Sequence, residues 1–259
     1  MAENHSTELA AAIMAAGKGT RMNNPQMAKV MFPIGGVPMI HHVVRRALDA
    51  DAGRVIAIIG HNRESVREYL SGVYGNAVEF AEQTEQLGTG HAVMQAAPLL
   101  DGFGGDLLIL SGDVPLLGAA TIGKLRNHHR QSSAVATVLT VTADDPTGYG
   151  RIIRNSDGMV ARIVEQKDAS EEERAVREVN SGIYIFRAPD LLEALSHLGN
   201  DNAQGEYYLT DVFGWFRQQG RPVAAYASDD FSEVLGINTV AQLAEADAEF
   251  MRRNGAIHN

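Results

Sequence analysis

Cysteine is absent from the 259 residues of this sequence, which excludes disulfide bonds and thiolate metal sites. Long apolar runs are absent too, since none approaches the roughly 20 residues that a membrane-spanning helix needs. The polar segment 1–8 lacks the apolar stretch of a secretory signal, and we expect it to be a disordered tail. These absences predict a soluble, cytoplasmic protein that does not bind membranes.

Positive charge is the scarcer sign: 22 lysines and arginines stand against 32 aspartates and glutamates, a formal net charge of −10. This balance argues against nucleic-acid binding, because a polyanion requires a basic face. If the ligand is an anion, its positive partners must gather locally. Apolar residues make up 45% of the chain, which is enough for a sizeable core.

What is present is an alternation of strand-like and helix-like segments. It predicts an α/β fold with a mixed, mostly parallel sheet flanked by helices. In the first half, strands are expected over 9–14, 55–59, 77–80 and 106–110, and helices over 38–50, 64–70 and 91–100. In the second half, strands are expected over 134–141, 151–154, 159–165, 179–186 and 223–227, and helices over 189–198 and 209–219. Thr239 with Gln242 three residues later predicts a capping box at the start of a last helix.

A glycine-rich loop follows the first strand directly. Gly17 and Gly19 allow the backbone to turn tightly and aim N–H groups at an anion, while Lys18 and Arg21 add positive charge. The loop is not a P-loop, because that motif needs Ser or Thr where Gly19 stands. It is not a dinucleotide-binding loop either, because Met22 stands where that motif needs a third small residue. It is either an ordinary strand–helix connection or an anion site.

Lys29 lies in the apolar stretch 28–33, ahead of a Gly35–Gly36 turn. A lysine in such a stretch either extends along the surface to reach water or points into a cleft to meet negative charge. We favour the cleft, and the presence of Arg21 and Lys29 shortly after the glycine loop favours its interpretation as an anion site. Arg21 and Lys29 are therefore our candidates for catalytic positive charges.

The segment 82–92 contains a second ligand-binding pattern. Gln83 carries a side-chain amide that can pair with the edge of a base. Gly88 and Thr89 allow the backbone to approach a ligand at a helix N-terminus. His91, at the start of that helix, is interpreted as a structural donor and not as a catalyst.

Asp113 follows a buried strand in the run Ser111-Gly112-Asp113-Val114-Pro115. Open α/β sheets bind ligands at the carboxyl ends of their strands. Mg²⁺ needs only one or two protein oxygens beside waters and phosphates. The sequence therefore predicts a magnesium ligand at Asp113, and the alternative that this residue only shapes the turn stays open.

The second half adds Gly148-Tyr149-Gly150-Arg151, Glu165-Gln166-Lys167-Asp168, Asn180-Ser181-Gly182, the run 202–211 and Gly236-Ile237-Asn238-Thr239. With the loops above, and in this order, these motifs resemble the uridylyltransferase domain of bacterial bifunctional UDP-N-acetylglucosamine pyrophosphorylase. The resemblance covers nearly the whole chain from about Leu9. It rests on Gly-Thr-Arg-Met, Gln-Leu-Gly-Thr-Gly-His-Ala, Gly-Asp-Val-Pro-Leu, Asp-Pro-Thr-Gly-Tyr-Gly-Arg-Ile and Asn-Ala-Gln-Gly-Glu-Tyr-Tyr-Leu-Thr-Asp.

The resemblance implies a Rossmann-like nucleotidyltransferase fold in one domain over 9–255. A nucleotide lobe would span about 9–131, a sugar-phosphate lobe about 132–238, and a C-terminal helix 239–254. It implies a Mg²⁺-dependent enzyme that joins UTP to N-acetylglucosamine 1-phosphate, releases pyrophosphate, and serves peptidoglycan synthesis in the cell wall.

The family's site residues transfer to matching positions of this chain. The nucleotide would be bound by Met14, Ala15, Ala16, Gly17, Lys18, Lys29, Ser111 and Gly112, and uracil by Gln83, Gly88 and Thr89. Asp113 and Asn238 would hold Mg²⁺. The N-acetylglucosamine site would be lined by Gly150, Glu165, Asn180, Tyr208 and Thr210.

Three positions depart from the family pattern. Met14 replaces the usual leucine, Ala28 replaces a proline, which would loosen that loop, and Ser111 replaces an often aromatic residue on the ribose side. The β-helix acetyltransferase domain that usually follows would lie beyond Asn259, so we expect no acetyl transfer by this chain. Two other functions stay open: a related transferase with another sugar or nucleotide, and a non-catalytic regulator that binds nucleotide sugars. The oligomeric state also stays open.

Overall fold

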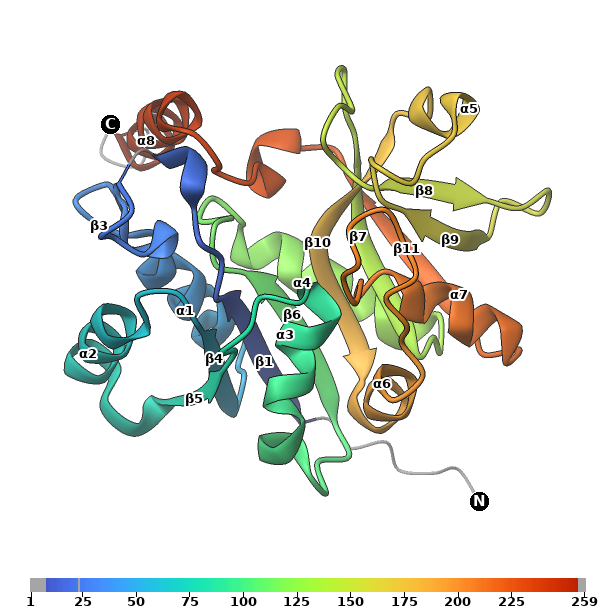
Figure 1. Ribbon diagram of the computed structural model, residues 1–259, viewed down its shortest axis with the longest axis horizontal. Coiled ribbons are helices and arrows are strands. Elements are labelled where there is room, and N and C mark those ends of the chain that lie inside the picture. Colours follow the sequence, from blue (N-terminus) through green and yellow to red (C-terminus); the bar gives the residue numbers. More distant parts are fainter. Residues whose placement is uncertain (1–7, 23, 256–259) are drawn as a thin grey trace.

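The computed structural model describes residues 8–22 and 24–255. Except for Glu8, the expected tail over 1–8 lies outside these described residues. The centre of the molecule is a nine-stranded sheet whose main path has the order β11-β7-β10-β6-β1-β4-β5 (Figure 1). The expected mixed, mostly parallel sheet flanked by helices is therefore confirmed.

The first half supplies four strands that all run in the same direction. They are β1 (Leu9–Ala15), β4 (Arg54–Ile59), β5 (Val78–Glu82) and β6 (Asp106–Ser111). The helices of this half are α1 (Met39–Asp49), α2 (Arg63–Tyr74), α3 (Thr89–Ala96) and α4 (Ala119–Gln131). A small hairpin, β2 (Pro33–Ile34) and β3 (Val37–Pro38), turns at Gly35 and Gly36, whose φ angles are +57° and +83°.

The second half adds an antiparallel strand to this sheet. β10 (Glu178–Arg187) lies between β6 and β7 (Ala136–Thr142) and is antiparallel to both, while β11 (Val223–Ser228) is parallel to β7. β8 (Arg151–Arg154) and β9 (Val160–Val164) form a hairpin that joins the sheet at β10. The helices are α5 (Glu171–Arg174), α6 (Ala188–Leu195), α7 (Asp211–Gln218) and α8 (Val240–Gly255).

Both faces of the sheet are covered. In β1, Leu9, Ala11 and Ile13 belong to a core that includes α1, α2 and α4, while Ala10 and Ala12 belong to a core that includes α3, α6 and α7. Strands covered on both faces read as continuous apolar runs, as β1, β4 and β6 do. Among the described residues, no helix has the length and apolarity that crossing a membrane requires.

Several helices differ from the sequence-based expectation. The helix expected over 91–100 ends at Ala96, because Ala97–Leu100 form a 3-10 helix, and the one expected over 189–198 ends at Leu195. α2 continues to Tyr74 instead of ending at Leu70, because Tyr74 packs against the core and its hydroxyl donates to the His41 carbonyl over 3.1 Å. α5 was not expected, since its four residues are polar and no apolar periodicity marks it. Its signal was the capping box of Ser170 and Glu173, which the structure contains. The capping box of Thr239 and Gln242 is confirmed by hydrogen bonds in both directions.

A third, smaller core joins α8 to residues from the first half of the chain. Ile34, Met39 and Leu116 pack with Ile237 and with Ala246 of α8. Figure 1 shows α8 beside β3, although the two lie near opposite ends of the chain. The contact places the segment before α8 next to the loop that follows β6, where the Ile237 N–H donates to the Asp113 carbonyl over 3.0 Å.

Candidate active site

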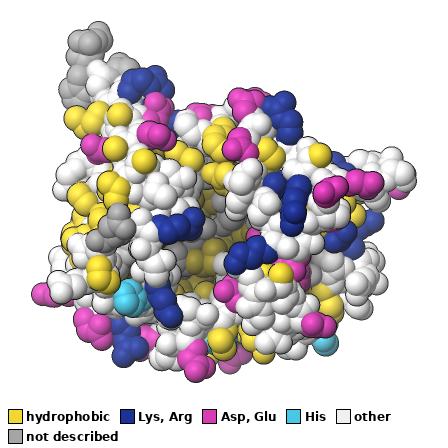
Figure 2. Space-filling model, turned by 45° about the horizontal axis from the view of Figure 1, so that its top comes forward, with side chains coloured by type: hydrophobic (Ala, Val, Ile, Leu, Met, Phe, Trp, Pro, Cys, Tyr) yellow, Lys and Arg dark blue, Asp and Glu magenta, His cyan; other side chains and the backbone are white. Residues whose placement is uncertain are grey.

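A cavity of about 300 Å³ opens at the carboxyl ends of β1, β5 and β6, the edge where open α/β sheets bind ligands. Its walls are formed by Met14, Ala15, Ala16, Gly17, Lys29, Val30, Gln83, Gln86, Gly88, Thr89, Ala92, Ser111, Asp113 and Glu206. Four of these were not singled out from the sequence: Val30, Gln86, Ala92 and Glu206. Figure 2 shows a hollow with an apolar floor and with Lys and Arg side chains on both sides of its rim.

The glycine loop after β1 packs directly against Lys29. Gly19 has a φ of +60°, and a Cβ atom there would lie 2.6 Å from the Lys29 Cβ, so only glycine fits without displacement. Gly60, at the end of β4, has a similar role that the sequence did not reveal. A Cβ atom on Gly60 would lie 2.7 Å from the Ala16 Cβ and 2.8 Å from the Gln83 carbonyl oxygen.

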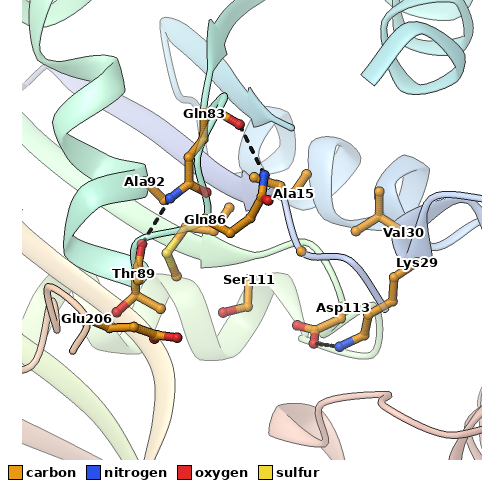
Figure 3. A pocket seen from close by; sticks show the side chains of 14 residues that line it. Ala15, Lys29, Val30, Gln83, Gln86, Thr89, Ala92, Ser111, Asp113 and Glu206 are labelled. Atoms are coloured by element: carbon orange, nitrogen blue, oxygen red, sulfur yellow. Dashed lines mark hydrogen bonds and ion pairs between the residues drawn. The ribbon is translucent and has the colours of Figure 1, made fainter. Parts of the chain in front are cut away.

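Lys29 holds together the residues predicted for the metal and the phosphates. Its Nζ donates to Asp113 Oδ2 over 2.5 Å (Figure 3). It also donates to Asn238 Oδ1 over 2.7 Å. Arg21 also donates to Asn238 Oδ1, over 3.0 Å. The side chains of Lys29 and Asp113 are only 12% and 23% exposed, so this pair is shielded from bulk water. Lys18 is exposed and is not among the residues that line the cavity.

From the sequence, Asp113 is either a magnesium ligand or a residue that only shapes the turn after β6. The turn after β6 is closed by the backbone, with the Val114 N–H donating to the Ser111 carbonyl over 3.1 Å. The Asp113 carboxylate contacts Lys29 instead, so the side chain is directed to the site and not to the turn.

The oxygens of Asp113 and Asn238 fit a hard cation. Both lie within 2.7 Å of one ammonium nitrogen, so this spot already stabilises a positive charge between a carboxylate and an amide oxygen. Mg²⁺ binds such oxygens and usually takes only one or two from the protein. No cluster of three or more His, Cys, Asp or Glu side chains able to hold a metal occurs within residues 8–22 and 24–255.

Gln83 is fixed at the opposite end of the cavity. It is 4% exposed and donates from Nε2 to the Gly88 carbonyl over 3.1 Å. The His91 ring lies between the amides of Gln83 and Gln95, 3.1 Å from each, which is the structural hydrogen-bonding position expected for it. Because the amide nitrogen of Gln83 is held by the protein, its oxygen Oε1 is the atom that can meet a base.

The residues predicted for the sugar lie together on the other half of the sheet. The Thr210 hydroxyl donates to Glu165 Oε1 over 3.1 Å, and the Asn180 N–H donates to the Gly150 carbonyl over 2.9 Å. A Cβ atom on Gly150 would lie 3.5 Å from Glu165 Oε1, so the two pairs are neighbours. The Tyr208 hydroxyl donates to Asp168 over 3.1 Å, and burial raises the pKa of Tyr208 to about 12, which keeps this donor protonated.

Glu165 offers a test of this cluster through its titration. Burial, with smaller like-charge contributions led by Asp211, raises the pKa of Glu165 above its ordinary value of 4.5. The folded state therefore holds the proton more tightly than the unfolded state, and stability falls as pH rises above 4.5. Glu165→Gln should raise the thermal unfolding midpoint by a few degrees at pH 8, and the gain should vanish at pH 4. Melting curves at both pH values check this, with exposed Glu172→Gln as the control; a gain that does not depend on pH would contradict it.

Comparisons with known proteins show the family to which the chain belongs. A family model described as nucleotidyl transferase matches residues 10–236. The bifunctional protein GlmU of Geobacter metallireducens is 51% identical over 239 residues, which are 92% of this chain and 50% of that protein. The bifunctional protein GlmU of Streptococcus suis is 49% identical over 249 residues, which are 96% of this chain and 53% of that protein. The chain thus spans about half the length of these relatives.

Solved structures share the fold at much lower sequence identity. A UDP-glucose pyrophosphorylase complexed with UDP-glucose superimposes with a TM-score of 0.76 at 18% identity, covering 96% of this chain and 100% of the other. The apo form of a UDP-glucose pyrophosphorylase gives a TM-score of 0.77 at 19% identity, covering 95% and 99%. The expected nucleotidyltransferase fold is therefore confirmed.

Proposed function

Because this chain belongs to the nucleotidyl transferase family, we propose that it joins UTP to N-acetylglucosamine 1-phosphate and releases pyrophosphate. One observation carries this proposal: Lys29, Asp113 and Asn238 converge beside a cavity whose far end is formed by Gln83 and Gly88. This arrangement suits a nucleoside triphosphate, with positive charge for its phosphates and amide groups for its base. The similarity to GlmU proteins over their matching half supports the choice of uracil and of N-acetylglucosamine.

The reaction requires the protein to position the two substrates and to neutralise their negative charge. A phosphate oxygen of the sugar phosphate attacks the α-phosphorus of UTP, and the bond from that phosphorus to the β,γ-pyrophosphate breaks in line. The attacking oxygen is already anionic, so no general base is required. Lys29 would exchange its contacts with Asp113 and Asn238 for phosphate oxygens, and Arg21 with Lys18 would steady the departing pyrophosphate.

We assign the metal and sugar sites as part of the same proposal. Asp113 and Asn238 would hold Mg²⁺, which when bound would neutralise phosphate charge that develops during the transfer. Gly150, Glu165, Asn180, Tyr208 and Thr210 would bind the sugar, and the backbone of residues 14–17 and 111–112 would bind the nucleotide. The lobes would span about 9–131 and 132–238 of one domain. We also propose that the enzyme is cytoplasmic and that its product is used in peptidoglycan synthesis.

Substrate choice is the direct test. UTP with N-acetylglucosamine 1-phosphate should exceed dTTP with glucose 1-phosphate by at least about tenfold in kcat/KM, a difference of roughly 1.4 kcal/mol. Pyrophosphate release measured across a panel of nucleotides and sugar phosphates checks this. Equal or reversed preference would favour a related transferase with another sugar or nucleotide. Tight binding of UDP-N-acetylglucosamine without turnover of any pair would instead favour a regulator.

A further inference from the structure

One carboxylate in the nucleotide cavity has no part in the reaction as proposed. Glu206 comes from the second half of the chain, yet it lines the same cavity as Lys29 and Asp113. Asp113 is paired with Lys29, whereas the Glu206 carboxylate has no hydrogen bond or ion pair with any described residue. An unpaired carboxylate repels a polyanion, whereas it can accept hydrogen bonds from a ligand group that donates them.

The backbone of Glu206 is fixed on both sides. Its N–H donates to Asn202 Oδ1 over 3.2 Å, and its carbonyl accepts from Asn202 Nδ2 over 2.6 Å. The next residue, Tyr207, donates from its N–H to the Leu87 carbonyl and accepts from the Gly90 N–H, both over 2.8 Å. Glu206 is therefore preorganised at the boundary of the two halves, so little ordering is needed when a ligand binds.

The loop predicted to read the base touches Glu206 directly. A Cβ atom on Gly88 would lie 2.9 Å from the Glu206 Cβ, so glycine at this position, with φ +109°, permits the contact. Figure 3 shows the Glu206 side chain next to Thr89 and Ser111 between Glu206 and Asp113. The Ser111 hydroxyl donates to the Gly182 carbonyl over 3.2 Å, which leaves its oxygen able to accept. Two acceptors thus face the space between the base end and the phosphate end of the cavity.

We propose that Glu206, assisted by Ser111, is a specificity-determining residue that accepts hydrogen bonds from the ribose hydroxyls of the nucleotide. This inference rests on the proposed function, which places the base at Gln83 and the phosphates at Lys29. Ribose links base to phosphates, so its hydroxyls reach the wall between these two ends. A carboxylate has two oxygens and can accept from two neighbouring hydroxyls at once, with charge-assisted bonds. The cavity then selects ribonucleotides over nucleotides that lack these hydroxyls.

The experiment compares UTP with 2′,3′-dideoxy-UTP, at fixed N-acetylglucosamine 1-phosphate, in wild type and three variants. Wild type should prefer UTP by about 10²-fold or more in kcat/KM, because a site built for a hydroxyl rejects an analogue without it. Glu206→Ala should lower kcat/KM for UTP by about 10- to 100-fold and leave the dideoxy nucleotide within about threefold. Glu206→Gln keeps one acceptor oxygen, so its kcat/KM for UTP should lie between those of wild type and Glu206→Ala. Glu85→Gln removes an exposed charge from the neighbouring loop, outside the cavity, and should match wild type.

Other kinetic outcomes of this experiment would overturn the inference. Equal losses for both nucleotides would overturn the inference and indicate that Glu206 reads the sugar phosphate instead. Unchanged UTP kinetics in both Glu206 variants would overturn it as well. If wild type does not use UTP but uses another nucleotide, the proposed function fails and the inference fails with it. Thermal melts accompany every variant; if Glu206→Ala does not fold, Glu206→Gln must lower the preference for UTP at least about threefold.

Discussion

Replacing Asp113 with alanine should lower kcat by about 10²–10³ while the protein stays folded. The carboxylate is the charged member of the proposed metal site, and losing the ion removes charge neutralisation from the transition state, a cost of about 3–4 kcal/mol. Asn238→Ala should cost less, because a neutral amide oxygen contributes less to a cation than a carboxylate does. Pyrophosphate release measured as a function of Mg²⁺ concentration checks both, and the exposed carboxylate of Asp101, replaced by alanine, serves as the control.

Stability separates this role from a structural one. The turn after β6 is closed by the backbone, and Lys29 keeps its contact with Asn238 when Asp113 is removed, so the free energy of unfolding should change by about 1 kcal/mol or less. A turn-forming role would give the reverse pattern, with a clear loss of stability and normal activity in the folded fraction. If either variant keeps normal activity and normal dependence on Mg²⁺, the replaced residue is not a ligand.

Replacing Lys29 with methionine should lower kcat/KM for UTP by about 10³, which we expect to be the largest effect of any single change. Methionine preserves most of the apolar stem and removes the positive charge, so Asp113 would face the phosphates without compensation. Lys29→Arg should still have a kcat/KM for UTP at least about tenfold below that of wild type. A planar guanidinium is not equivalent to a compact ammonium, and Gly19 already packs closely against the Lys29 side chain.

Binding measurements complete this test. Calorimetric titration with UTP should show affinity reduced at least about tenfold in Lys29→Met, because a charge-assisted contact is lost. Lys124 is exposed on α4 and outside the cavity, so Lys124→Met should bind and react as wild type does. Near-normal catalysis in Lys29→Met would mean that Arg21 and Lys18 supply sufficient charge and that Lys29 only balances Asp113.

The departures from the family pattern become interpretable only with the structure. Ala28 is buried and has a φ of −60°, a value that proline would also impose, so the backbone conformation survives without the ring. Ser111 is short, and its hydroxyl reaches the Gly182 carbonyl instead of filling the cavity as an aromatic ring would. The sequence identified both positions as unusual, but which neighbours each contacts depended on strands from the other half.

Local patterns were sufficient for the order and type of most elements and for the loops at the strand ends. Apolar runs and turn residues act over a few positions, so β1, β4 and β6 and the loops after them were predicted close to their true bounds. The cavity-lining loops at Gly17, Gln83 and Ser111 were identified for the same reason: a glycine or polar group directly after a buried strand is visible in the sequence.

Only the tertiary structure decided which of these segments meet. Lys29 and Asn238 are 209 positions apart, and they touch because the small core of Ile237 and α8 packs against β2 and α1. Glu206 enters the nucleotide cavity because Tyr207 pairs with Leu87 and Gly90. Such contacts form when apolar faces that are far apart in the sequence are buried together, and when distant backbone segments pair. The local sequence pattern of each segment does not indicate which other segment it will meet. The chemistry of each group is therefore local in origin, whereas their assembly into one site is not.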